Sequence, residues 1–173
     1  MVVSTAVGIL QPHIKPGELA LLDQFIDRTT KRASTFYDGA PTSPFGVCHI
    51  PMPEPFCAET RETVLGVASE LGLRMHETAT VVCIEGPRFS SRAESQWFQS
   101  LGGDIINMSV VPEAPLAAEA GLSYCAIAMC TDYDSWKDDE EHVTVEMVMD
   151  VSQPLPGSTH ISLETNQKAD LLS

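Results

Sequence analysis

Short apolar runs rich in β-branched residues alternate with helix-like segments along most of this chain. Residues 80–84 (Thr-Val-Val-Cys-Ile) are too few for a helix and read as a buried strand. Residues 58–71 carry apolar side chains at helical spacing, and Gly72 follows as a C-terminal cap. Because strands that alternate with helices favour parallel pairing, we predict an α/β fold with a mixed, largely parallel central sheet flanked by helices.

Further elements follow from local signals. Helices are expected from Ser91 to Gly102, where Ser91 and Glu94 have capping-box spacing, and over residues 112–120. Strands are expected at residues 1–3, 19–22, 104–108 and 123–129. Residues 28–56 have no periodicity and hold five of the 12 prolines, which predicts a long irregular excursion of the functional kind.

Charge and composition exclude several classes of protein. Lys plus Arg is 10 and Asp plus Glu is 24, a net charge of −14, so we expect no nucleic-acid partner. No apolar run approaches the roughly 18 residues of a membrane span, and no membrane partner is expected. The five cysteines are odd in number and favour reduced thiols, which predicts a cytoplasmic protein, with the nucleus as a second location.

Ligands of such sheets usually bind outside the carboxyl ends of strands, which selects residues 4–8, 107–109 and 131–134, and the strand-to-helix turn at residues 85–91 is a fourth such position. Asp132 and Asp134 flank one residue, so in an extended backbone both carboxyls face the same side. Mutual repulsion and burial would raise the pKa of one of them toward neutrality. The spacing alone is equally consistent with two plainer interpretations of these residues: a solvated loop, or an Asp that caps the next turn.

Other polar clusters have plainer interpretations. The acidic run at residues 138–141 is expected to be a solvated face. His49 beside Cys48 has no ligand-spaced partner, so no metal site is predicted. Arg88 and Arg92 bracket a helix N-terminus, which suits either an anion or surface salt bridges. The motifs Gly-x-Ser-x-Gly and Gly-x-x-x-x-Gly-Lys are both absent.

Six segments, in order along the chain, together resemble the trimeric purine nucleoside phosphorylase family, most closely its members that act on 5′-methylthioadenosine: residues 4–8, 23–30, 46–52, 85–94, 107–113 and 131–134. The resemblance implies a nucleoside phosphorylase-like fold and phosphorolysis of 5′-methylthioadenosine to adenine and 5-methylthioribose 1-phosphate, in purine and methionine salvage. It implies no cofactor beyond inorganic phosphate as co-substrate, and a homotrimer in the full-length form.

The same resemblance assigns residue roles. Asp132 would share a proton with purine N7 and Asp134 would accept from the 6-amino group. Ser90, where 6-oxopurine enzymes carry Glu, points to an aminopurine, because adenine N1 offers no proton for a Glu to accept. The remaining roles implied are base and ribose contacts for Phe89, Ser90, Asn107, Met108 and Thr131, phosphate contacts for Thr5, Ala6 and Ser109, and a methylthio pocket of His49, Val145 and Val148.

The chain also departs from the family pattern. A segment with phosphate-binding residues precedes the strand at Met1 in the family, Ile9 replaces a small or hydroxylic residue, and residues 152–173 diverge. We therefore expect one partial domain over residues 1–173, incomplete at the N-terminus, with a divergent tail, impaired activity and poor solubility. Two alternatives stay open: a purine nucleoside phosphorylase of broader specificity, and a non-catalytic subunit that associates with full-length trimers.

Overall fold

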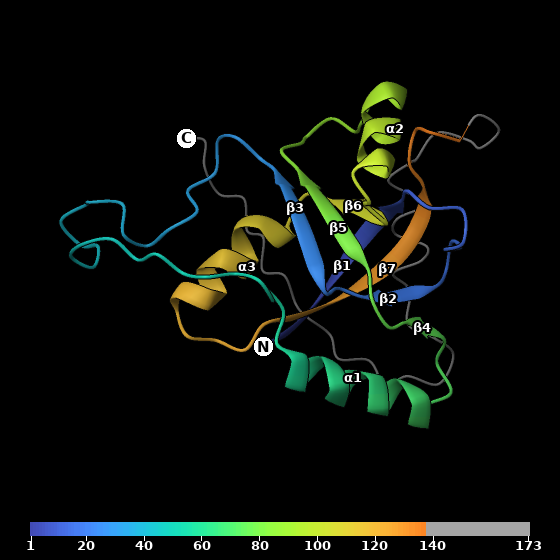
Figure 1. Cartoon of the computed structure of the whole chain (residues 1–173), viewed down its shortest axis with the longest axis horizontal. Coiled ribbons are helices and arrows are strands. Elements are labelled where there is room, and N and C mark those ends of the chain that lie inside the picture. Colours follow the sequence, from blue (N-terminus) through green and yellow to red (C-terminus); the bar gives the residue numbers. More distant parts are fainter. Residues whose placement is uncertain (138–173) are drawn as a thin grey trace, which may run out of the picture.

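The computed structural model describes residues 1–137, which form a seven-stranded mixed sheet with three helices around it (Figure 1). The sheet order is β3-β5-β6-β1-β7-β2-β4. Four of the six strand pairs are parallel and two, β1–β6 and β2–β7, are antiparallel, which confirms the predicted fold class. The strands are β1 Val2–Ile9, β2 Leu19–Leu21, β3 Gln24–Arg28, β4 Met75–His76, β5 Thr80–Ile84, β6 Ile105–Asn107 and β7 Cys125–Tyr133.

Three helices accompany the sheet, with α1 at the bottom of the view and α2 at the top (Figure 1). Their bounds are α1 Ala58–Glu70, α2 Arg92–Ser100 and α3 Val110–Glu119. The helix expected over residues 112–120 is confirmed, because Val111 has non-helical angles (φ −110°, ψ 124°) and the regular turns follow it. The capping box at the start of α2 is confirmed as well.

The sheet buries both of its faces. Val81 and Ile105 belong to the larger apolar cluster, whereas their chain neighbours Val82 and Ile106 belong to a second cluster on the other face. Successive residues of a strand point to opposite faces, so a strand covered on both sides needs an unbroken apolar run. This explains why β5 and β6 are apolar at nearly every position.

Some elements differ from expectation. The sequence does not predict β3 and β4, because β3 ends in Asp27 and Arg28 and β4 has only two residues. β7 continues to Tyr133, beyond the expected end at residue 129, since its polar end is held by pairing with β1. Although α1 forms as predicted, Ala68 is its one buried residue, and Val67 is 49% exposed.

The irregular excursion is also confirmed, since no helix or strand lies between β3 and α1. It projects from the body of the molecule at the left of Figure 1. Two of its apolar side chains face outward, with Phe45 104% and Val47 73% exposed. All five cysteines are free thiols.

A single carboxylate organises the entry to α2. Glu94 Oε2 accepts from the Ser91 N–H at 2.8 Å, and both Nη atoms of Arg88 donate to Glu94, at 2.7 and 2.8 Å. The Arg88 guanidinium, followed by the Ser91 N–H, lowers the pKa of Glu94 to about 2. The sequence left two roles open for Arg88, an anion site or a surface salt bridge. In the structure Arg88 forms a surface salt bridge, with Glu94.

We expect Glu94→Gln to lower the free energy of unfolding at pH 7 by about 0.5–1 kcal/mol, the size of a partly exposed charge pair. The folded pKa lies below the unfolded one, so the stabilisation is present above the unfolded pKa and is lost as the pH falls toward 2. Urea denaturation at pH 7 and pH 3 measures the difference. Glu62→Gln, on exposed α1 surface, is the control, and an effect of Glu94→Gln that does not shrink at pH 3 would contradict the assignment.

Candidate active site

A cavity of about 340 Å³ lies where two groups of strands meet. β3, β5 and β6 run parallel to one another, and so do β1 and β7, but the two groups are joined by a short antiparallel contact of Gly8 and Ile9 with β6. The carboxyl ends of β5 and β6 therefore reach residues 5–8 of β1 and the end of β7. Within each group the cavity lies toward the carboxyl ends of the strands, as expected for ligand sites in such sheets. The cavity itself is formed where the two groups of strands meet.

Ten of the thirteen residues singled out in the sequence line this cavity: Thr5, Ala6, Phe89, Ser90, Asn107, Met108, Ser109, Thr131, Asp132 and Asp134. His49 lies on the irregular excursion and does not line it. Val145 and Val148 fall outside the described residues, as does the acidic run at 138–141. Val7 and Gly8, from the selected residues 4–8, complete the apolar part of the wall together with Ile84 and Ile106, which the sequence did not single out.

Two buried carboxyls occupy the β7 side of the cavity. Asp132 is 8% exposed and Asp134 is 5% exposed. Asp132 lies opposite Gly8 in the β1–β7 ladder, and the Asp134 N–H donates to the Ile9 carbonyl at 2.9 Å. Burial raises the pKa of Asp134, while the neighbouring hydroxyl of Ser95 acts in the opposite direction. This is the direction that burial of a carboxyl predicts.

The hydroxyl of Thr131 links Asp132 to the backbone of β1. Thr131 Oγ1 lies 2.5 Å from Asp132 Oδ1 and 3.1 Å from the carbonyl oxygen of Val7. Both the Val7 carbonyl and an ionised carboxylate only accept hydrogen bonds, and a hydroxyl has one hydrogen to donate. The Thr131 hydroxyl therefore donates to one of these two oxygens at a time, or shares its single hydrogen between them.

Three buried polar atoms of cavity residues make no hydrogen bond of regular geometry within residues 1–137: Asp134 Oδ2, Ser90 Oγ and Asn107 Oδ1. The Ser90 and Ser95 hydroxyls nevertheless lie close enough to the Asp134 carboxyl to lower its pKa. Buried polar atoms of folded proteins nearly always have a partner. Their grouping around one cavity indicates a ligand that supplies hydrogen-bonding groups. Asp134 and Ser90 lie on the same side of the cavity, since both are close enough for Ser90 to influence the Asp134 carboxyl.

A second polar group lies on the β1 and β6 side. Thr5 Oγ1 and Ser109 Oγ are 3.2 Å apart, and Asn107 Nδ2 donates to both, at 3.2 and 3.4 Å. These uncharged donors lie beside a cavity wall that, among residues 1–137, contains no Lys, Arg or His. Such a group can hold an oxygen-rich part of a ligand through hydroxyl and amide contacts.

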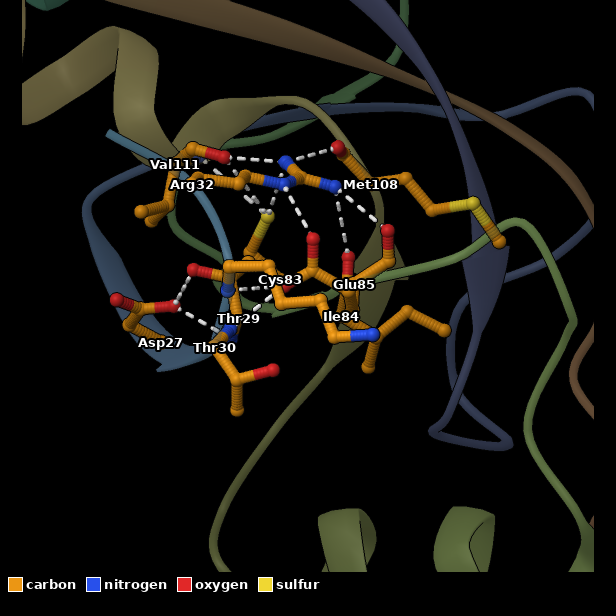
Figure 2. Close-up of polar contacts among 10 residues, drawn as sticks. Asp27, Thr29, Thr30, Arg32, Cys83, Ile84, Glu85, Met108 and Val111 are labelled. Atoms are coloured by element: carbon orange, nitrogen blue, oxygen red, sulfur yellow. Dashed lines mark hydrogen bonds and ion pairs between the residues drawn. The ribbon is translucent and has the colours of Figure 1, made fainter. Parts of the chain in front are cut away.

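Two further residues shape the cavity without a sequence signal that would reveal them. Gly86 has φ +65°, and a Cβ added there would lie 2.6 Å from Met108 Sδ, so only glycine allows this approach. Arg32 donates to the carbonyl of Met108 from the irregular excursion, 76 positions away in the chain (Figure 2). A contact between residues so far apart in the chain cannot be predicted from a local sequence pattern.

Over residues 1–137, no group of three or more His, Cys, Asp or Glu side chains is arranged to hold a metal ion. No helix within the same range is long and apolar enough to cross a bilayer. The cavity is consequently interpreted through its own carboxyl, hydroxyl and amide groups.

Curated proteins provide close matches. S-methyl-5′-thioadenosine phosphorylase of Danio rerio is 62% identical over 149 residues, covering 86% of this chain and 53% of that protein. The protein of the same name from Aedes aegypti is 58% identical over 150 residues, with 86% and 53% covered. The chain spans about half the length of the curated relatives it matches.

Solved structures of proteins with the same kind of name are also similar to this chain. Methylthioadenosine phosphorylase from Schistosoma mansoni in complex with adenine superposes with a TM-score of 0.83 at 42% identity, covering 87% of this chain and 57% of that one. A mutant of the adenosine/methylthioadenosine phosphorylase from the same organism, in complex with methylthioadenosine, gives a TM-score of 0.81 at 41% identity, with 87% and 57% covered.

The family model described as the phosphorylase superfamily matches residues 1–155, which is most of the chain. The fold is thus shared with solved structures, and this chain is a member of the phosphorylase superfamily.

Proposed function

We propose that the protein cleaves 5′-methylthioadenosine by phosphorolysis, releasing adenine and 5-methylthioribose 1-phosphate. Curated relatives at 54–62% identity bear the name of this activity. Two similar Schistosoma mansoni structures hold adenine and methylthioadenosine. The reaction serves purine and methionine salvage, and inorganic phosphate is its one co-substrate.

The observation that carries the proposal is the grouping of Asp132, Asp134 and Ser90 in one buried corner of the cavity. Phosphorolysis leaves a cationic sugar, so catalysis requires a purine that departs easily and an anion held against C1′. Asp132 supplies a proton at N7, and Asp134 accepts from the 6-amino group. Ser90 leaves room at N1 without offering a carboxylate that would require an N1–H.

The contact between Thr131 and Asp132 supports the role of Asp132 as an acid. When the Thr131 hydroxyl donates to Val7, the 2.5 Å approach of Asp132 is favourable only if its carboxyl is protonated. A carboxyl held in the acid form can deliver its proton as the glycosidic bond breaks. Thr131 thus provides Asp132 with a hydrogen-bond partner in either protonation state.

Sugar and phosphate occupy the other side of the cavity. Thr5, Ala6 and Ser109 hold phosphate through hydroxyl and backbone N–H donors, next to the Asn107 amide that already contacts both hydroxyls. Met108 contacts the ribose, and Phe89, 56% exposed at the cavity wall, stacks on the base. No metal ion or organic cofactor takes part in this scheme.

We also propose a homotrimer in which His49 reaches the methylthio pocket of a neighbouring subunit. The supporting observation is the excursion that carries His49, because its exposed Phe45 and Val47 are costly in water and gain from contact with another chain. Val145 and Val148 complete the same pocket in this proposal. The five free thiols suit a reducing compartment, the cytoplasm and the nucleus.

Adenosine is a second candidate substrate, because one similar structure belongs to an adenosine/methylthioadenosine phosphorylase. Release of free base from methylthioadenosine, adenosine and inosine, each with and without phosphate, separates the possibilities. In line with the impaired activity expected from the sequence, we expect phosphate-dependent adenine release from this chain to be slow, but faster from methylthioadenosine than from adenosine, with negligible base release from inosine. Faster cleavage of inosine would instead indicate a purine nucleoside phosphorylase of broader specificity.

Adenine binding by calorimetry is measured on the same preparation, because it depends on the described cavity alone. Binding without turnover would favour the non-catalytic subunit. Absence of both binding and phosphate-dependent release would overturn the proposal.

Replacing Asp132 by Asn should reduce cleavage of methylthioadenosine by at least about a hundredfold, since an amide cannot supply the acidic proton. The ratio of inosine to methylthioadenosine cleavage should rise, because the amide can donate to O6. Initial rates with both nucleosides measure the change. Asp38→Asn, on the excursion and outside the cavity, is the matched control, and an unchanged substrate ratio in Asp132→Asn would contradict the assignment.

Asp134→Asn should increase the free energy of unfolding and weaken the binding of adenine. Burial raises the folded pKa of Asp134, so its ionisation destabilises the fold as the pH rises through that pKa. The variant should therefore exceed the unsubstituted chain in free energy of unfolding by more at pH 7 than at pH 4. Adenine affinity should fall about tenfold, because a neutral amide oxygen accepts more weakly than a carboxylate.

Urea denaturation at the two pH values and calorimetry with adenine provide the measurements. Asp38→Asn should give the opposite pH dependence of stability, because hydrogen bonds from Ser43 and from the Ala40 N–H lower the pKa of Asp38, and it should leave adenine binding unchanged. A variant that gains no stability at pH 7, or binds adenine as tightly as the unsubstituted chain, would contradict the role of Asp134.

A further inference from the structure

One guanidinium connects two separate loops beside the cavity (Figure 2). Arg32 Nη2 donates to the carbonyls of Ile84 and Glu85, at 3.2 and 2.9 Å, where the chain leaves β5. Its Nη1 donates to the carbonyls of Met108 and, at 2.5 Å, Val111, where the chain passes from β6 to α3. The first loop continues to Phe89 and Ser90, and the second contains Met108 and Ser109.

Glu85 and Met108 lie just beyond the last residues of β5 and β6, so the sheet ladder does not provide donors for their carbonyls. Ile84 is the last residue of β5, and Met108 follows the end of β6. Part-buried backbone carbonyls require a donor, and an arginine offers several in a planar fork. A lysine ammonium is a compact charge that cannot span both loops with the same geometry.

The guanidinium is itself held in place. Glu85 Oε1 lies 3.5 Å from Arg32 Nε, and Glu85 Oε2 accepts from the N–H groups of Thr30 and Lys31, at 2.6 and 3.1 Å. The Arg32 side chain is 20% exposed and the Glu85 side chain 30%. The turn after β3 is therefore fixed by the same carboxylate that orients Arg32.

A buried thiol forms the floor of this arrangement. Cys83 is fully buried, its Sγ accepts from the Val111 N–H at 3.4 Å, and Arg32 Nη1 lies 4.0 Å from it. Strand β5 thus contacts the start of α3 directly, and Arg32 covers that contact from outside. The loop that contains Met108 is held from both sides.

We propose that Arg32 is a positioning residue for the sugar and phosphate side of the cavity. It fixes the backbone of Met108, and with it the adjoining Ser109, relative to the loop that carries the base-binding Phe89 and Ser90. This inference rests on the proposed function for the identity of the ligands. It predicts that the loss of Arg32 affects ligands that contact Met108 and Ser109 more than it affects free adenine.

The test uses the 173-residue chain with Arg32→Lys. Arg61→Lys is the matched control, because Arg61 Nη2 also donates to a backbone carbonyl, that of Glu77 at 2.7 Å, but no residue of α1 lines the cavity. A second variant, Glu85→Gln, keeps the arginine and weakens the group that orients it. It serves if Arg32→Lys does not fold, and it should act in the same direction with a smaller effect.

Two measurements are made on each variant. Calorimetry should show methylthioadenosine binding weakened about ten- to a hundredfold in Arg32→Lys, and adenine binding changed less than about threefold. The reason is that a displaced Met108 and Ser109 weaken only those ligands that contact them. Amide hydrogen exchange should accelerate over residues 84–90 and 107–112 and stay unchanged over residues 58–70. Arg61→Lys should alter neither measurement at the cavity.

A purely structural role would affect both ligands equally or neither, and that result, like unchanged exchange over residues 107–112, would overturn the inference. If the unsubstituted chain bound neither ligand, the proposed function would fail. Hydrogen exchange would then decide on Arg32 independently: acceleration confined to the two loops supports positioning, and uniform or absent acceleration refutes it.

Discussion

The parallel pairing of β1 with β7 is the interaction on which the cavity depends. It extends from Val2 opposite Cys125 to Ile9 opposite Tyr133, and so joins parts of the chain more than a hundred positions apart. The side-chain period of a strand is two, so a slip of one residue would turn Asp132 to the other face. The bond from Thr131 Oγ1 to the Val7 carbonyl closes the end of this ladder.

Elements with strong local signals were predictable. β5 was predicted at its observed bounds because a run of five apolar or β-branched residues is too short for a helix and typical of a buried strand. The start of α2 was predictable because Ser91 and Glu94 satisfy each other's backbone groups, a relation that spacing alone encodes. For Asp132 and Asp134, local sequence left a shared pocket and a solvated loop equally open, and the structure, in which both line the cavity, agrees with the first of these.

Features that depend on contacts between distant segments were not predictable. Nothing in the sequence of β6 shows that it meets β1 antiparallel over two residues, although the junction of the two strand groups arises there. Arg32 lies in a stretch without periodicity, and its acceptors are backbone carbonyls, which have no residue signature. The helical spacing that predicted α1 was sound, but it could not indicate that Val67 and Leu71 would remain 49% and 67% exposed.

The unpartnered oxygens of Asp134, Ser90 and Asn107 have a consequence for discrimination between ligands. A cavity of this kind discriminates chiefly through the free-energy cost of unsatisfied polar atoms. An analogue of the right shape that lacks the matching groups leaves these buried oxygens without a hydrogen-bond partner. Such penalties separate related ligands far more sharply than a missing apolar contact does. A flat hydrocarbon ring that fits between the walls would incur this penalty, so the basis of discrimination lies in the arrangement of the protein's own polar atoms.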